Sequence, residues 1–286
     1  MISAKSLLYQ SVLLRWALLL RRCGQRSFTY RPLERWTGGD ALLVAPHPDD
    51  ECLGAAGTLL RHRAQGDRVA VVIVTDGSGS RAVTGERAAR AALRRREAEC
   101  ACARLGVDLT WLGWPEAGWQ AQPSLAALRE RVEKATLLYL PSVVDFHPDH
   151  LAVARIVAPW LRADQRVRVY ELSVPLTPTL TTLLVDTTEV AATAHDALQC
   201  HHSQRGAWQP LVRRMAYRSA LHGMAQCEPF WALDGAAYQR MVNAAAWQWQ
   251  TTPFRGLRPR PFSDGAAYWQ GQAARRALWQ AASGEA

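Results

Sequence analysis

Short apolar runs alternate with longer segments of helical periodicity over more than half of the chain. The runs are nearly continuous in apolar residues, which is typical of strands that are buried on both faces. A strand, a helix and a second strand in that order form a βαβ unit, whose right-handed crossover lays the helix on the sheet. The pattern therefore predicts an α/β fold, with a Rossmann-like, mostly parallel sheet over about residues 38–190 and helices on both faces. The predicted strands are residues 41–45, 68–75, 109–112, 137–140, 167–172 and 183–185, and the predicted helices are residues 54–65, 86–105, 125–134 and 151–161.

The two ends of the chain differ from this alternating region. Residues 189–249 have a helical pattern throughout, and residues 251–263 are rich in Pro and Arg, which is typical of a linker. We predict three parts: a basic, apolar N-terminal helix (1–37), a main domain that ends in a helical region (38–250), and a Pro/Arg-rich linker with a tail that forms one more short helix (251–286).

The N-terminal apolar segment, residues 6–20, contains Arg15 and is followed by Arg21 and Arg22. It lacks a small-residue cleavage site and is shorter than the roughly 20 residues that cross a bilayer. Two interpretations stay open. Residues 5–22 form a basic amphipathic helix on the anionic inner membrane surface, or they form a helix that packs on the body or on a partner. We expect a cytoplasmic protein, peripheral on the inner membrane in the first case.

Composition narrows the class of protein without choosing a function. A chain of 286 residues with 49% hydrophobic content can bury a large core, and its net charge of +9 is compatible with an anionic partner. The excess charge is mostly arginine outside the clusters described below, and no DNA or RNA recognition module is present, so we predict no nucleic-acid partner. The six cysteines form neither a C-x-x-C pair nor a regular framework, which favours a reducing compartment and buried, apolar cysteines. The oligomeric state is not indicated.

Two polar clusters each follow a predicted strand and open a predicted helix. The first is residues 45–51, APHPDDE, and the second is residues 145–150, DFHPDH. Ligand sites in open α/β sheets lie at the carboxyl ends of the strands, so the two clusters can meet at one edge of the sheet.

Imidazole and carboxylate side chains with one open position suit a catalytic Zn²⁺, which takes three protein ligands. His47 and Asp50 can bind from one turn, and His150 completes the set from the other. For either cluster alone, the alternative is that its aspartates cap the following helix. The presence of both clusters, each after a strand, favours the metal site.

The remaining polar residues of the two clusters have the chemistry of proton transfer. Asp49 is next to a predicted ligand and is available to take a proton from water. His147 can polarise the substrate carbonyl or protonate the leaving amine, and Asp149 can orient His147 by accepting its other ring N–H.

At these residues the sequence resembles the LmbE-like, or PIG-L, family of zinc-dependent N-acetylglucosaminyl de-N-acetylases. The resemblance implies the same roles: His47, Asp50 and His150 as metal ligands, Asp49 as general base and His147 as acid or electrophile. Some relatives have a Tyr or Arg just before the second histidine motif, where this chain has Asp145 and Phe146. Weaker matches are residues 74–77 (VTDG), Arg94 and Glu97 before 105–107 (LGV), residues 112–116 (LGWPE), and residues 197–204, which end in Ser203 and Gln204.

Three residues are candidates for contact with the substrate. Arg94 matches an arginine that faces the substrate in relatives, against the alternative of a solvated charge on an arginine-rich helix. Glu116 stands where relatives more often have Asp, and is a candidate for binding a sugar hydroxyl. Trp114, beside Glu116, can stack on a sugar ring, although a role in the core is the alternative. The adjacent His201 and His202 lack ligand partners at a suitable spacing and are interpreted as surface or packing residues.

The residues together predict a zinc-dependent hydrolase that removes an N-acetyl group from an N-acetylglucosamine-type amino sugar or glycoconjugate and releases acetate. Two alternatives remain: a metal-dependent amidase that acts on another small N-acyl conjugate, and a non-catalytic metal-binding scaffold. The intact set of five candidate ligands and catalytic residues argues against the scaffold.

Overall fold

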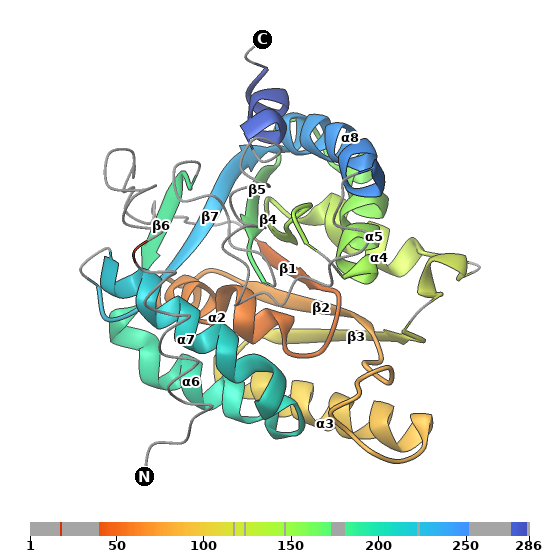
Figure 1. Cartoon of the computed structure of the whole chain (residues 1–286), viewed down its shortest axis with the longest axis vertical. Helices are drawn as coiled ribbons and strands as arrows, with labels where there is room; N and C mark the ends of the chain where they lie inside the picture. The colour runs from red at the N-terminus through yellow and green to blue at the C-terminus, as the bar shows by residue number, and fades with distance from the viewer. Residues whose placement is uncertain are drawn as a thin grey trace.

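The computed structural model describes residue 18 and residues 40–116, 118–122, 124–145, 147–172, 181–221, 224–251 and 276–284. Within this part of the chain, a seven-stranded sheet has the order β3-β2-β1-β4-β5-β7-β6 (Figure 1). Strands β1 to β5 are parallel, and β7 runs antiparallel to both β5 and β6. The strands are β1 (Ala41–Ala45), β2 (Val69–Thr75), β3 (Asp108–Trp114), β4 (Leu137–Pro141), β5 (Arg166–Tyr170), β6 (Leu183–Asp186) and β7 (Cys227–Asp234).

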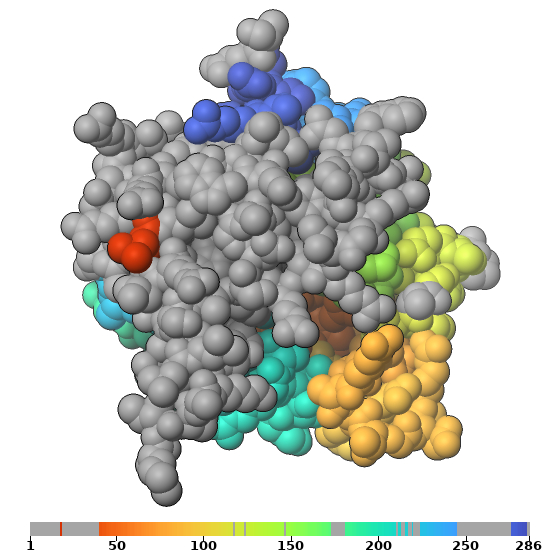
Figure 2. Space-filling model, viewed as in Figure 1, coloured from red at the N-terminus to blue at the C-terminus, as the bar shows by residue number. Residues whose placement is uncertain are grey.

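Helices cover both faces of the sheet, and each face has its own apolar core (Figure 1). One layer contains α2 (Asp50–Ala64), α3 (Arg87–Leu105), α6 (Ala191–Gln199) and α7 (Arg205–Leu221). The opposite layer contains α4 (Ala126–Lys134), α5 (Pro148–Val157) and α8 (Gly235–Thr251). Figure 2 shows the surface of α3 next to that of α7 on one face of the molecule. The predicted α/β fold with a mostly parallel sheet is confirmed.

The strand order positions the site. The chain passes from β1 to β2 on one side and later returns to β4 on the other side of β1, with Leu43 paired to Tyr139. The strand order therefore reverses between β1 and β4. A crevice forms at such a point, outside the carboxyl ends of the two strands. The first histidine cluster begins at the end of β1, and the second begins at Asp145, shortly after β4 ends at Pro141.

The predicted helical region of residues 189–249 is wrong at β7, which interrupts it. All but two residues of β7 are buried, so both of its faces are covered and the sequence lacks the alternation that marks a half-exposed strand. Pro229 lies opposite Leu184 of the edge strand β6 and beyond the last pair of β7 with β5, which is Phe230 with Tyr170.

The predictions for the chain ends are tested only in part. Most of the N-terminal segment, including residues 5–17 and 19–22, and most of the linker lie outside the described residues. Residues 276–283 form the expected short helix in the tail, where Leu278 and Ala282 are buried against the core beside α8. Among the described residues, no helix is both long and apolar enough to cross a membrane.

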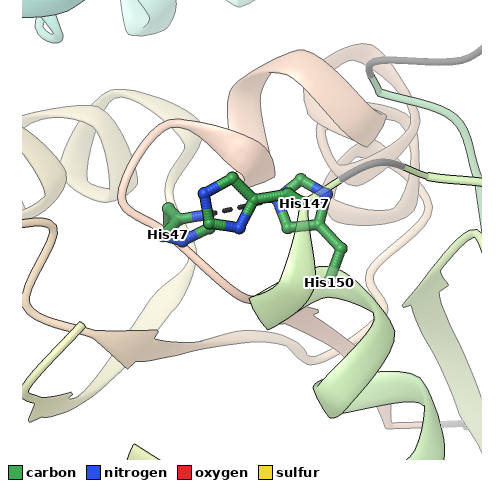
Figure 3. A group of neighbouring side chains, drawn as sticks. All are labelled: His47, His147 and His150. Carbon is green, nitrogen blue, oxygen red and sulfur yellow. Dashed lines mark hydrogen bonds between the residues drawn. The ribbon is translucent and has the colours of Figure 1, made fainter. Parts of the chain in front are cut away.

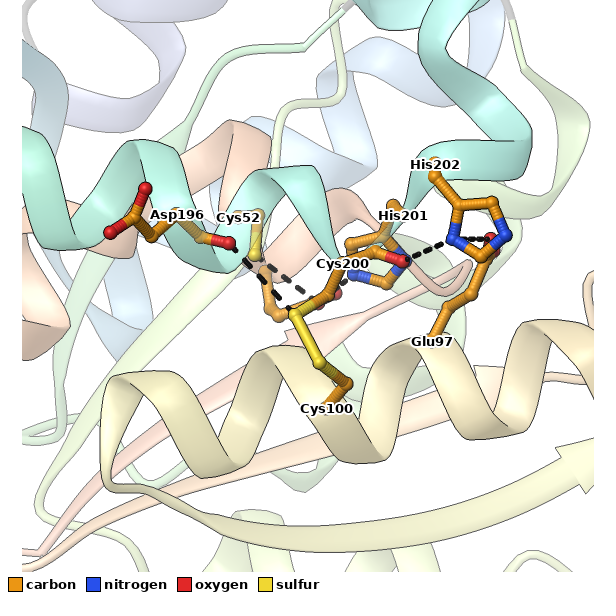
Figure 4. The surroundings of a disulfide bond; sticks show 8 residues. Cys52, Glu97, Cys100, Asp196, Cys200, His201 and His202 are labelled. Carbon is orange, nitrogen blue, oxygen red and sulfur yellow. Dashed lines mark hydrogen bonds and ion pairs between the residues drawn. A yellow bond between two sulfur atoms is a disulfide. The ribbon is translucent and has the colours of Figure 1, made fainter.

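The cysteines follow the prediction in part. Cys52, Cys102 and Cys227 are buried thiols, as expected. Cys100 on α3 and Cys200 at the end of α6 instead form a disulfide between the two helices (Figure 4). The prediction was wrong for this pair because two cysteines 100 residues apart leave no local pattern, and only the packing of α3 on α6 brings them together.

Candidate active site

The first turn places His47 and Asp50 at the carboxyl end of β1. The backbone N–H of His47 donates to Asp50 Oδ2 at 2.8 Å, and the backbone N–H of Asp50 approaches the His47 carbonyl at 3.3 Å. Asp50 is the first residue of α2, so its carboxylate also lies near the positive end of that helix. The four-residue turn thereby points an imidazole and a carboxylate into the same space.

The second turn starts α5 beside β4. His147 is the N-cap residue: its ring nitrogen Nδ1 accepts a hydrogen bond from the backbone N–H of Asp149 at 3.3 Å. Pro148 occupies the first helical turn, where its missing N–H costs no hydrogen bond. His150 follows in the same turn, and Figure 3 shows the rings of His147 and His150 gathered around that of His47.

The donor atoms of His47, Asp50 and His150 form a nearly equilateral triangle. Nδ1 of His47 lies 3.1 Å from Nε2 of His150 and 3.4 Å from Oδ2 of Asp50, and the third side, from Nε2 of His150 to that oxygen, is 3.3 Å. The ligand atoms of a tetrahedral zinc site with bonds of about 2.0–2.1 Å are roughly 3.3 Å apart. The three residues therefore have the spacing of a metal-binding triad.

A second set of contacts orients the two imidazoles. Oδ2 of Asp149 lies 3.1 Å from Nε2 of His47, and its Oδ1 accepts a hydrogen bond from the indole of Trp119 at 3.0 Å. Oδ2 of Asp145 lies 3.1 Å from Nδ1 of His150. Carboxylates in these positions fix the tautomer and the orientation of ligating histidines.

Asp149 consequently orients a different histidine from the one expected. Its carboxylate is 3.9 Å from the nearest nitrogen of His147, against 3.1 Å for His47. Both Asp149 and His147 are at the start of α5, and the helix turns the carboxylate back across the sheet edge toward β1. The contacts of Trp119 and Asp145 were missed by sequence reasoning, although the family difference at Asp145 had already singled out that position.

The charges of the site favour a cation at its centre. Burial alone would lower the pKa of His47, but the hydrogen bonds that its ring donates to the carboxylates of Asp149 and Asp50 raise it to about 9. Burial opposes ionisation of Asp50, yet the charge of His150 and its hydrogen bond hold the pKa of Asp50 below its usual range. The negative groups around the triad thus stabilise positive charge there.

His147 has the opposite environment. Burial and the nearby positive charges of His47 and His150 lower its pKa to about 4, so the ring is neutral at pH 7. Its side chain is 41% exposed, the most open of the three histidines. A neutral imidazole facing the cavity can donate an N–H hydrogen bond to a substrate oxygen.

Asp49 is held in an unusual backbone conformation beside the triad. Its φ of 117° is the only positive φ of a non-glycine among the described residues. Oδ2 of Asp49 is 3.2 Å from Nη2 of Arg94, and burial raises its pKa to about 6 against the opposing effect of that guanidinium. Arg94 is only 2% exposed and also donates to the Pro48 carbonyl, so the interpretation of Arg94 as a solvated charge is wrong.

The triad opens into a cavity of about 250 Å³. Polar residues line one part of it, including Asp49, His147, Arg94 and Glu116, while an apolar wall is formed by Leu53, Leu172, Trp208 and Leu211. The carboxylate of Glu116 accepts the N–H of Gly79 at 2.9 Å, and its Oε1 is 4.0 Å from Nε2 of His47.

Trp114 is placed differently from Arg94 and Glu116. Its ring stacks on Trp119 with centroids 5.9 Å apart, and it packs against the apolar core instead of lining the cavity. The indole that lines the cavity is Trp208, which comes from α7, a helix whose place beside the site no local motif indicates.

Another group of potential metal ligands, separate from the triad, is buried behind the first turn and consists of Glu51, Cys52 and His201. Its closest contact, 2.6 Å between Glu51 Oε1 and His201 Nε2, is a hydrogen-bond distance and is too short for two ligands of one metal ion. His201 is fully buried and His202 is largely exposed.

Comparison with known proteins agrees with the fold and with the two motifs. Residues 42–161 match the family described as GlcNAc-PI de-N-acetylase, or PIG-L. A 1D-myo-inositol 2-acetamido-2-deoxy-alpha-D-glucopyranoside deacetylase from Thermobispora bispora is 31% identical over 147 residues, which are 40% of this chain and 49% of that protein. The chain spans about half the length of the curated relatives it matches.

Solved structures of different activity share this fold. An N,N'-diacetylchitobiose deacetylase from Pyrococcus horikoshii is similar at 20% identity with a TM-score of 0.58, over 85% of this chain and 96% of that one. A 4-carboxy-2-hydroxymuconate hydratase from Pseudomonas putida KT2440 is similar at 19% identity with a TM-score of 0.57, over 68% and 95%. At these identities the likeness concerns the fold alone. The resemblance predicted from the two histidine motifs is confirmed by the sequence match to the PIG-L family over residues 42–161, which contain both motifs.

Proposed function

We propose that this protein is a zinc-dependent N-deacetylase that hydrolyses the acetamide of an N-acetylglucosamine-type amino sugar or glycoconjugate and releases acetate. The observation that carries the proposal is the triangle of donor atoms from His47, Asp50 and His150, with sides of 3.1–3.4 Å, beside the buried carboxylate of Asp49. The match to a de-N-acetylase family and the deacetylase activity named for the curated relative support it.

The two imidazoles and one carboxylate of the triad fit zinc in ligand type as well as in spacing. When bound, zinc supplies Lewis acidity at the amide carbonyl and lowers the pKa of a water molecule to about 7. Asp49 takes the proton from the attacking water and returns it to the amine nitrogen as the C–N bond breaks. Its pKa of about 6 suits this role, because a base works best when its pKa is near the working pH. Arg94 holds the Asp49 carboxylate in place.

His147 acts on the other side of the scissile bond. As a neutral ring with one N–H, it donates a hydrogen bond to the carbonyl oxygen as negative charge develops there. No oxyanion contact from a Tyr or Arg is needed at residues 145 and 146 if His147 has this function. Asp149 contributes by keeping His47 in the tautomer that presents Nδ1 to the metal.

The proposed substrate fits the two-sided cavity. Glu116 offers a charged group to sugar hydroxyls, and Trp208 offers an apolar face to a sugar ring. Arg94 borders the cavity, but its guanidinium contacts Asp49 and Glu97, so in this proposal it supports the base. Trp114, the indole favoured by sequence, is replaced by Trp208 in this proposal because Trp114 packs into the core.

The test is acetate release from a panel of N-acetylhexosamine conjugates by the full chain with one equivalent of zinc restored. We expect turnover on at least one conjugate, and its loss in the Asp49→Asn variant with zinc still bound. Bound zinc without release from any conjugate would contradict the amino-sugar proposal.

The apolar wall favours a second candidate, a metal-dependent amidase that acts on another small N-acyl conjugate. Leu53, Leu172 and Leu211 could contact an acyl group larger than acetyl or an apolar part of the conjugate. Assaying matched N-acetyl, N-butyryl and N-octanoyl derivatives separates the two: faster hydrolysis of the longer acyl groups would favour this second candidate.

Membrane contact through residues 5–22 also remains a proposal. Flotation with anionic vesicles compares the full chain with a form that begins at Thr37, and neutral vesicles serve as the control. We expect only the full chain to float with anionic vesicles, because a basic amphipathic helix binds anionic lipid. Equal recovery of both forms would overturn the proposal.

A further inference from the structure

The segment of residues 200–204 (CHHSQ) lies between α6 and α7, about 150 residues after the turn that carries Asp49. Figure 4 shows it beside α3, with His202 next to Glu97. Two separate chains of hydrogen bonds and ion pairs lead from Asp49, and both end in this segment.

The first chain holds the backbone of Asp49. Its N–H donates to Glu51 Oε2 at 3.0 Å, and the other oxygen of Glu51 lies 2.6 Å from Nε2 of His201. Glu51 and His201 are both fully buried, so no water competes for these contacts. The carbonyl of His201 is itself fixed by the indole N–H of Trp208 at 3.1 Å.

The second chain holds the carboxylate of Asp49. Arg94 contacts Asp49 through Nη2 and contacts Glu97 through Nη1, each at 3.2 Å. Glu97 in turn accepts two hydrogen bonds from Ser203, one from the backbone N–H at 2.8 Å and one from the hydroxyl at 2.7 Å. Glu97 is 3% exposed, and removing a partner from such a buried carboxylate leaves an uncompensated acceptor.

The conformation of Asp49 explains why two chains are needed. A non-glycine residue at a φ of 117° is strained, and such strain persists only when the surroundings fix the backbone from several directions. The local sequence supplies the Glu51 contact to the Asp49 N–H and the hydrogen bonds that the N–H groups of Cys52 and Leu53 donate to its carbonyl. The contact to its carboxylate comes from Arg94 on α3, and residues 201–203 hold Glu51 and Glu97.

We propose that His201 and Ser203 are positioning residues that hold Asp49, through Glu51 and through Glu97 and Arg94, in the orientation needed for proton transfer. The proposal rests on the function of Asp49 as general base proposed above. Neither residue lines the cavity, so they act through Asp49 and not on the substrate.

The kinetic test uses Ser203→Ala, which removes the hydroxyl but keeps the backbone N–H. We expect kcat to fall about 10- to 100-fold with KM and zinc content unchanged, because a small misplacement of a catalytic group has effects of this size. Ser203→Thr, which keeps the hydroxyl, restores most of the rate. Ser219→Ala is the matched control: this fully buried hydroxyl bonds to Met215 and Cys227, away from the turn, and its loss leaves kcat unchanged.

A double-mutant cycle separates positioning from general destabilisation. If Ser203 acts through Asp49, then Ser203→Ala has no further effect on the residual rate of Asp49→Asn. If the rate of the double variant falls by the product of the two single-variant losses, the proposal is overturned.

A readout without substrate keeps the proposal testable if the proposed activity fails. Hydrogen exchange of the peptide that covers residues 46–51 reports the N–H groups of this turn, including that of Asp49. We expect faster exchange there in Ser203→Ala and in His201→Gln, and unchanged exchange in Ser219→Ala. Protection equal to that of the unsubstituted protein in both variants would show that residues 201–203 do not hold the turn, whatever the reaction is.

Discussion

The two turns that present the site histidines, residues 46–51 and 145–150, are built in different ways. The second is organised by its own residues: Asp145 accepts the backbone N–H of His147 at 2.9 Å, and the His147 ring caps the helix that Pro148 begins. The first contains the strained Asp49, whose partners include Arg94 on another helix and, through Glu51, His201.

This difference separates the predicted metal ligands from the predicted base. Asp50 begins a helix and His150 follows the N-cap of another, so the predicted metal ligands are placed by the two turns, by the pairing of β1 with β4 and by the Asp149 contact that joins the turns. The predicted base, Asp49, depends on packing between α2, α3 and the segment before α7. We therefore expect that zinc binding and turnover can be lost separately, and the following predictions test this in order of decreasing effect.

The largest effect is expected for Asp50→Ala, which removes one corner of the triad. Activity should fall by at least about 10³-fold, since metal chemistry contributes several kcal/mol to the barrier, and zinc content measured by mass spectrometry should fall with it. Asp164→Ala, which removes an exposed carboxylate, is the control and should change neither quantity. An active Asp50→Ala protein with full zinc would mean that the triad is misassigned.

Asp49→Asn should separate the two functions. The amide keeps the shape of the side chain but cannot take a proton, so kcat should fall about 10²- to 10⁴-fold with zinc retained. Steady-state kinetics and metal analysis of the same preparation check this. If zinc is lost together with activity, Asp49 is a ligand and the distinction between the two turns fails.

Asp149→Asn tests the contact that crosses from one turn to the other. Because Asp149 contacts Nε2 of His47, its loss should weaken zinc binding by about 10- to 100-fold, as measured by competition with a chromophoric chelator. Trp119→Phe removes only the indole N–H that holds Asp149 and should have a smaller effect in the same direction. Unchanged zinc affinity in Asp149→Asn would show that this carboxylate does not orient His47.

The sequence was sufficient to predict the α/β fold and the meeting of the two turns, because strand and helix periodicity are local and parallel strand ends share one edge of a sheet. It was insufficient for contacts made by side chains on packed helices. The shift of Asp149 from His147 to His47, the hydrogen bond of Trp119 and the link between Glu51 and His201 all depend on how helices rotate against the sheet. The Cys100–Cys200 pair was missed for the same reason.

The smallest effect is expected for Pro148→Ala, in the locally organised turn. Pro148 sits at the start of α5, where its fixed φ suits the helix and its ring restricts the unfolded chain. Its replacement should lower the free energy of unfolding by about 0.4–1 kcal/mol in urea titration, while kcat and zinc affinity stay within about two-fold, because the cap from His147 and the contact from Asp145 remain. A ten-fold loss of turnover in Pro148→Ala would instead mean that the second turn also stores a strained geometry. The two turns would then no longer differ in the way proposed, in which Ser203→Ala slows catalysis from a site remote in sequence and Pro148→Ala does not.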